Sequence, residues 1–170
     1  MRRYILAIAL ALASVSASAQ LQHTKGQMGA GFRGGIGYNG YDLGLMYNYH
    51  FNNDVALLVE LDREKAEFDY SDFTNTILLG TGVNVMLWNP TLWLYMHGSA
   101  TANIGYDEWD CKVVDWTHEN IVYGASAGID FEAYPWHFLS VVLKARQWIL
   151  FDDGSSYAKP DFSLGVKYNW

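Results

Sequence analysis

Cysteine, proline and positive charge are all scarce in this chain of 170 residues. Its one cysteine, Cys111, has no intrachain partner, which excludes a secreted domain held together by disulfide bonds. Lysine and arginine (11) are outnumbered by aspartate and glutamate (18), so the formal net charge is −7. Because a nucleic-acid-binding surface needs clustered basic residues, we expect no direct nucleic-acid partner.

Long apolar runs are also lacking, except at the N-terminus. Arg2 and Arg3 precede an apolar run at 4–13, and Ala17-Ser18-Ala19 supplies the small-x-small pattern that signal peptidase recognises. The run is shorter than the ~20 residues that a transmembrane helix requires. We therefore expect residues 1–19 to be a signal peptide cleaved after Ala19, and residues 20–170 to be one exported domain. The residue directly after the expected cleavage site is not a cysteine, so we expect no lipid anchor.

After residue 20 the chain shows a period of two, which is typical of β-strands, and no sustained helical period. Most of the alternating segments approach the ~9–11 residues that a tilted membrane strand needs. Eight segments alternate in this way, at about 27–38, 41–51, 54–62, 77–87, 92–105, 120–132, 139–149 and 161–170.

The expected connections alternate in length. Outer-membrane barrels have short periplasmic turns and longer external loops, and an even strand number leaves both termini in the periplasm. Asn39-Gly40, a hairpin-type turn, is the exception on the external side. We expect tight turns at Asn52-Asn53, Asn89-Pro90 and Pro135-Trp136, and longer acidic loops at 64–74, 107–119 and 152–160.

The charged residues decide between a membrane barrel and a soluble barrel or sandwich, which alternation alone also fits. One face of the strands is apolar throughout, as contact with lipid requires. The other face is rich in glycine and carries charges of both signs, which can pair inside a lumen that side chains just fill. We interpret these charges as a structural plug, with a narrow or gated pore as the alternative: Arg33, Glu60, Asp62, Asp130, Glu132, Lys144, Arg146 and Lys167.

Aromatic residues gather near both expected ends of the strands, as in the two aromatic girdles of outer-membrane barrels. The last strand ends on an aromatic residue, with apolar residues at every second position before it. We expect this pattern to be read by the outer-membrane assembly machinery: Phe162, Leu164, Val166, Tyr168 and Trp170. The predicted fold is all-β, an eight-stranded antiparallel up-and-down transmembrane barrel of OmpA or OmpX size in the bacterial outer membrane.

Motifs for catalysis or cofactors are weak. Residues 29–34 match G-x-G-x-x-G, but that motif requires a following helix, and here it lies inside a strand. His97 and Ser99 resemble a lipid-deacylating pair, yet alternation places both in the lumen rather than on the lipid face. The other histidines are scattered and have no metal-ligand spacing. We expect no enzyme activity, no cofactor and no metal site.

Several segments resemble the TraO family of conjugal transfer proteins. The likeness covers most of the mature length and is strongest near the C-terminus. It is carried by residues 22–26, 36–44, 123–125, 145–151 and 162–168. The resemblance implies a structural envelope component of a conjugative DNA-transfer apparatus, with other transfer proteins as partners. The alternatives are a general OmpX-like surface barrel whose loops bind partners, or a narrow pore.

Overall fold

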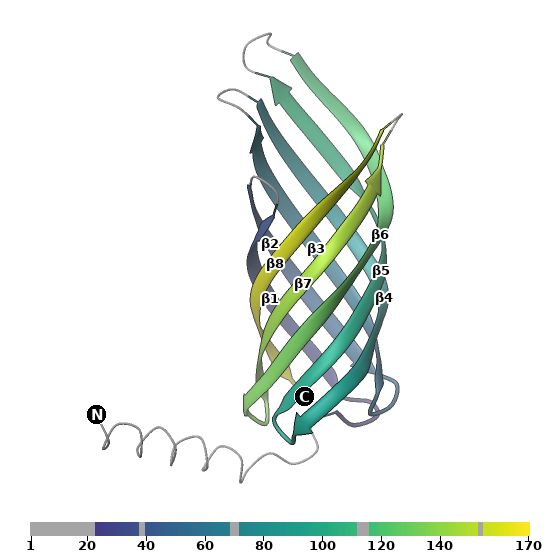
Figure 1. Ribbon diagram of the computed structural model, residues 1–170, viewed down its shortest axis with the longest axis vertical. Helices are drawn as coiled ribbons and strands as arrows, with labels where there is room; N and C mark the ends of the chain where they lie inside the picture. Colours follow the sequence, from purple (N-terminus) through teal and green to yellow (C-terminus); the bar gives the residue numbers. More distant parts are fainter. Residues whose placement is uncertain (1–22, 38–39, 69–71, 112–115, 153–154) are drawn as a thin grey trace, which may run out of the picture.

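The computed structural model describes residues 23–37, 40–68, 72–111, 116–152 and 155–170. These residues form a closed antiparallel barrel in which each strand pairs with its neighbour in sequence and β1 pairs with β8 (Figure 1). The predicted eight-stranded antiparallel barrel is therefore confirmed. The strands are β1 (Met28–Gly37), β2 (Gly40–His50), β3 (Val55–Phe68), β4 (Asp72–Thr91), β5 (Leu94–Cys111), β6 (Trp116–Trp136), β7 (Leu139–Phe151) and β8 (Ser156–Asn169).

The expected signal peptide, with its cleavage site after Ala19, lies outside the described residues. Within the described ranges, no helix is long and apolar enough to cross a membrane.

The two ends of the barrel differ. We call the end that holds Trp170 and the connections 51–54, 92–93 and 137–138 the terminal end, and the opposite end the distal end (Figure 1). The tight turns predicted at Asn89-Pro90 and Pro135-Trp136 are wrong by two or three residues. Both prolines lie inside strands, at the register shifts between Trp88 and Thr91 and between Ala133 and Trp136. Proline is accommodated at such irregularities because no regular ladder hydrogen bond is lost there.

The long distal loops predicted at 64–74, 107–119 and 152–160 are also wrong. Most of these residues continue the strands, so that β4, β5 and β6 reach 20, 18 and 21 residues, whereas β1 has 10. In Figure 1 the hairpin of β5 and β6 reaches furthest at the top. We call the part of the sheet formed by 72–76, 107–111 and 116–122 the distal extension.

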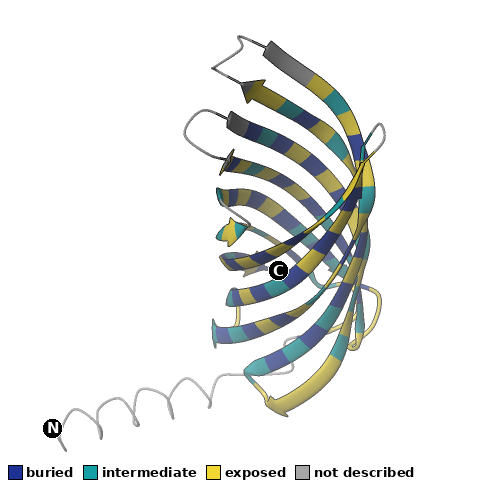
Figure 2. Ribbon diagram, turned by 45° about the horizontal axis from the view of Figure 1, so that its top comes forward, coloured by how far each residue is buried: buried dark blue, intermediate teal, exposed yellow. Residues whose placement is uncertain are grey.

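Burial is inverted relative to a soluble protein, and it alternates along every strand (Figure 2). Large apolar side chains face outward, such as Phe32 (65% exposed) and Leu45 (59% exposed). The inward face holds most of the charged groups, and Glu60 and Asp62 are almost completely buried. An outer surface this apolar is suited to lipid rather than to water.

Candidate functional site

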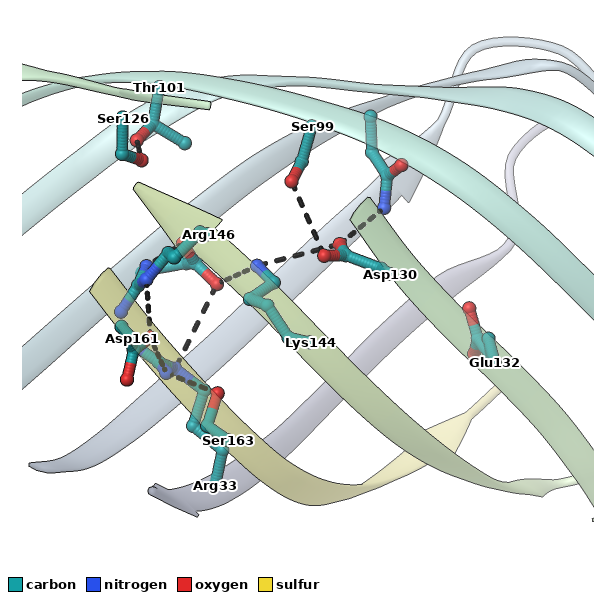
Figure 3. Close-up of polar contacts among 12 residues, drawn as sticks. Arg33, Ser99, Thr101, Ser126, Asp130, Glu132, Lys144, Arg146, Asp161 and Ser163 are labelled. Atoms are coloured by element: carbon teal, nitrogen blue, oxygen red, sulfur yellow. Dashed lines mark hydrogen bonds and ion pairs between the residues drawn. The ribbon is translucent and has the colours of Figure 1, made fainter. Parts of the chain in front are cut away.

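The centre of the lumen holds a network of buried charges. We call it the lumen ion-pair cluster; Figure 3 shows part of it. Arg146 on β7 donates hydrogen bonds to Glu60 (2.8 Å), Asp62 (3.0 Å) and Asp161 (2.7 Å). The members of the lumen ion-pair cluster are Arg33, Asp42, Glu60, Asp62, Asp130, Lys144, Arg146 and Asp161.

Arg33 on β1 contacts β8, the strand with which β1 pairs to close the barrel. Its guanidinium contacts Asp62 on β3, Asp42 on β2 (3.0 Å) and Asp161 on β8 (3.1 Å), and it donates a hydrogen bond to Ser163 on β8 (2.6 Å). A guanidinium has five N–H donors, so one arginine can serve several carboxylates at once. Arg33 therefore links four strands across the lumen.

Lys144 on β7 extends the cluster toward β6. Its ammonium pairs with Glu60, and it lies 3.5 Å from a carboxylate oxygen of Asp130. The other oxygen of Asp130 accepts a hydrogen bond from Ser99 on β5 (3.3 Å) (Figure 3). Removing one partner from such a buried network leaves a charge without compensation, which is strongly destabilising.

The structure buries all eight charged residues that we singled out in the sequence, but it divides them into two groups. Glu132 and Lys167 form a separate pair, 2.6 Å apart, toward the terminal end. Asp42 and Asp161 belong to the central cluster although the sequence analysis did not single them out. The alternating pattern places both residues on the inward face, and this could have identified them as lumen residues. Their partners depend on strand register, which periodicity does not specify.

Apolar side chains fill the lumen on the distal side of the cluster. Leu78, Val122, Trp148 and Leu150 pack together, with Tyr157 against them. The guanidinium of Arg146 lies 4.0 Å from the ring centroid of Trp148, which joins this apolar layer to the ion pairs through a cation–π contact.

Rings fill the lumen on the terminal side. His23 precedes β1, and its ring stacks on Tyr95 with centroids 4.1 Å apart; its Nε2 is hydrogen-bonded to the hydroxyl of Tyr134 at 2.9 Å. His50 and His97 lie beside it, with ring centroids 4.5 and 4.9 Å from that of His23. The expectation that the other histidines are scattered is therefore wrong for His23 and His50, which the closed barrel brings beside His97.

The structure also shows where the His97–Ser99 pair and the glycines of the 29–34 motif lie. His97 and Ser99 are both buried in the lumen, away from the outward apolar face. Gly29 and Gly31 lie where an added Cβ would strike neighbouring atoms of β8. At Gly29 the nearest atoms belong to the side chains of Asn169 and Asn48, and at Gly31 to the backbone of Val166.

A cavity of about 290 Å³ opens at the distal end. Trp109 and Tyr157 both contact the Asp107 carboxylate, Trp109 through its indole N–H (2.8 Å) and Tyr157 through its hydroxyl (3.4 Å). Lys159 pairs with Glu64 at 2.8 Å, so its charge is compensated. The lining residues are Thr74, Trp109, Asp152, Ser155, Tyr157, Ala158 and Lys159.

At the distal end, one edge of β6 lacks a paired strand among the described residues. β6 begins to pair with β7 at Tyr123, which lies opposite Phe151. Among the described residues, no strand pairs with 116–122 of β6 on that side. Unpaired backbone N–H and C=O groups at a sheet edge are a template for another strand. The distal extension itself carries acidic side chains that are at least partly exposed: Glu108, Asp110 and Glu119.

Known structures share this fold. Neisserial surface protein A is 13% identical, with a TM-score of 0.62 over 84% of this chain and 95% of that one. The N-terminal β-barrel domain of Pseudomonas aeruginosa OprF is 13% identical, with a TM-score of 0.65 over 86% of this chain and 98% of that one.

Ail of Yersinia pestis, the attachment invasion locus protein, is 13% identical, with a TM-score of 0.59 over 86% of this chain and 100% of that one. A second structure shows Ail in complex with the heparin analogue sucrose octasulfate (TM-score 0.55). No protein-family model and no curated protein sequence matches this chain. The likenesses establish the fold of small outer-membrane β-barrels.

Proposed function

We propose that this protein is a non-enzymatic surface barrel of the bacterial outer membrane that binds a partner protein through its distal extension. The observation that carries this proposal is the open edge of β6 at 116–122, which lies beyond a lumen filled with side chains. In this arrangement the terminal end faces the periplasm and the distal end faces the outside of the cell.

The outward apolar face supports a location in the membrane. Leu45, Leu79 and Ile129 are each exposed, whereas Asp42 on β2 and Asp130 and Glu132 on β6 are buried. A closed barrel pairs all backbone groups between strands, which lipid requires because it offers no hydrogen bonds. Export requires the expected signal peptide; the mass of the protein extracted from outer membranes tests cleavage after Ala19.

The filled lumen supports a barrel without a channel. Apolar side chains, ion pairs and rings follow one another from the distal end to the terminal end. In planar lipid bilayers, we expect the purified barrel to show no discrete conductance steps. Reproducible openings would favour the narrow pore instead.

Three features of the distal end favour a basic partner strand. The edge of β6 offers backbone hydrogen bonds to an added strand. Glu108, Asp110 and Glu119 provide negative charge beside it. Trp109 and Asp152 line the distal cavity, where an aromatic face and a carboxylate suit a lysine or arginine side chain.

Ail has been solved in complex with a heparin analogue, sucrose octasulfate. A sulfated glycan carries many negative charges, and the acidic residues of the distal extension would repel it. We therefore propose a basic protein rather than a polyanion as the partner.

Shortening one hairpin tests this proposal. Asp107 and Asn120 are register partners, so residues 108–119 can be replaced by an Asn-Gly turn without disturbing the barrel below. We expect cells displaying the full chain to adhere to immobilised basic proteins, and cells displaying the shortened chain to lose this adhesion. Equal adhesion by both would contradict the proposal. A heat-dependent gel shift of both proteins confirms that they are folded.

A structural role in a conjugative transfer apparatus is a second proposal. It is supported only by the sequence likeness to the TraO family, strongest at 145–151 and 162–168. Deleting the gene in a conjugative donor should then lower the mating frequency, and the full chain should restore it. An unchanged mating frequency would contradict a role in conjugative transfer.

A further inference from the structure

The terminal end of the lumen contains a group of metal-ligating side chains from three separate parts of the chain. His23 comes from the segment before β1, His97 from β5 and Glu132 from β6. One ligand atom from each residue lies within 4.8 Å of the other two. All three side chains are almost completely buried, so water does not compete for these atoms.

The hydrogen bonds in this region leave nitrogen atoms unused. The Nε2 of His97 lies 3.4 Å from the Nδ1 of His23, but the Nδ1 of His97 has no hydrogen-bond partner among the described residues. The neighbouring ring of His50 is buried too, and its Nδ1 is likewise without a partner there. A buried polar atom without a partner costs about 1–3 kcal/mol, so an ion that uses such atoms is favoured.

One carboxylate oxygen of Glu132 lies beside the histidines. Lys167 binds one oxygen of Glu132, and the other oxygen lies 3.7 Å from the Nε2 of His23. A neutral imidazole retains a lone pair for coordination.

We propose that His23, His97 and Glu132 bind a divalent transition-metal ion of the zinc class, which anchors the mature N-terminus inside the terminal end of the barrel. Two imidazoles and one carboxylate are a common donor set for zinc, whereas calcium and magnesium prefer oxygen ligands alone. His50 and the hydroxyl of Tyr134 lie beside the cluster and are available for a further contact.

The site would add a side-chain anchor to the segment before β1, which is not itself a strand. Gly26 and Gln27 are attached to β2 by backbone hydrogen bonds, such as Gly26 N–H to the carbonyl of His50 at 2.8 Å. A metal bond from His23 to β5 and β6 would fix this segment over the lumen. This inference is independent of the partner proposed for the distal end.

Titration with Zn²⁺ tests the site. Tag-free mature protein, folded in detergent and freed of metal with a chelator, should bind one equivalent of Zn²⁺ by calorimetry. His23→Gln and His97→Gln should each weaken binding at least tenfold. His137→Gln is the matched control, since His137 is exposed in the turn between β6 and β7.

His23 lies outside every strand, so His23→Gln is not expected to impair folding; a heat-dependent gel shift checks each variant. Visible absorption of the Co²⁺-loaded protein gives a second readout, because tetrahedral Co²⁺ absorbs strongly and this band should vanish in His23→Gln. Absence of stoichiometric Zn²⁺ binding by the wild-type protein would overturn the proposal. So would equal binding by His23→Gln, His97→Gln and the wild type.

Discussion

Arg146 on β7 and Asp161 on β8 are direct cross-strand neighbours, and the Nε of Arg146 donates a hydrogen bond of 2.7 Å to Asp161 Oδ2. The same oxygen lies 3.1 Å from Nη1 of Arg33 on β1. One carboxylate thus joins three strands, including the pair β1 and β8 at which the barrel closes. The lumen ion-pair cluster therefore reinforces the closing seam, where the first and last strands must find each other.

Arg146→Ala should destabilise the barrel. The substitution leaves Glu60, Asp62 and Asp161 without one of their cations in a buried site, for an expected loss of about 3–5 kcal/mol. Urea unfolding in lipid vesicles, followed by tryptophan fluorescence, measures this loss. Arg63→Ala is the control, because Arg63 is exposed and should change stability by less than about 0.5 kcal/mol. Equal unfolding midpoints for Arg146→Ala and the wild type would contradict a structural plug.

Gly44→Ala should also destabilise the barrel, for a steric reason. An added Cβ at Gly44 would strike the Asp62 carboxylate and approach Arg33 to 3.0 Å, so these paired groups must move apart. Overpacking of this kind costs about 1–3 kcal/mol. At Gly34 the nearest atom is a flexible leucine methyl at 3.4 Å, so Gly34→Ala should be tolerated. The same unfolding assay compares the two variants; an equal effect would show that space around the ion pairs is not limiting.

Period two was enough to predict the eight strands and the inward placement of His97 and Ser99, because side chains alternate strictly across a strand. It did not predict where the strands end. Acidic residues such as Glu108 and Asp110 are uncommon in strands, yet pairing with both neighbours keeps β5 extended there. Pro90 and Pro135 led to turns being predicted two or three residues too early, because register irregularities let both prolines lie within strands.

The sequence pattern does not predict which side chains meet across the lumen. His23, His50 and His97 lie on different elements, far apart in the chain, and only closure of the barrel makes them neighbours. Asp161 faces Arg146 because of the register of β7 and β8, which local alternation leaves open. Long-range register and closure therefore account for the parts of the candidate site that the pattern missed.

A charge on the outward face should be unfavourable. Leu45 lies in the middle of β2, is 59% exposed and faces away from the lumen. In lipid, Leu45→Arg should lower the unfolding free energy by roughly 2–4 kcal/mol, as expected near the bilayer midplane. Leu45→Phe, which keeps the site apolar, should have little effect. If both variants unfold at the wild-type urea concentration, this face does not contact hydrocarbon.

The C-terminal residues should affect assembly in cells more than stability. Trp170 is exposed, and its backbone N–H and carbonyl bond to Met28 whatever its side chain is. Truncating Tyr168 and Trp170 to alanine should therefore leave refolding in detergent nearly unchanged. In cells the same variant should reach the outer membrane in smaller amounts, because the assembly machinery would lose the aromatic end of the signal formed by Phe162, Leu164, Val166, Tyr168 and Trp170. Heat-dependent gel mobility of refolded protein and of outer-membrane fractions separates the two effects. A parallel loss in both would assign these aromatic residues to stability, whereas unchanged amounts in both would remove the signal from this strand.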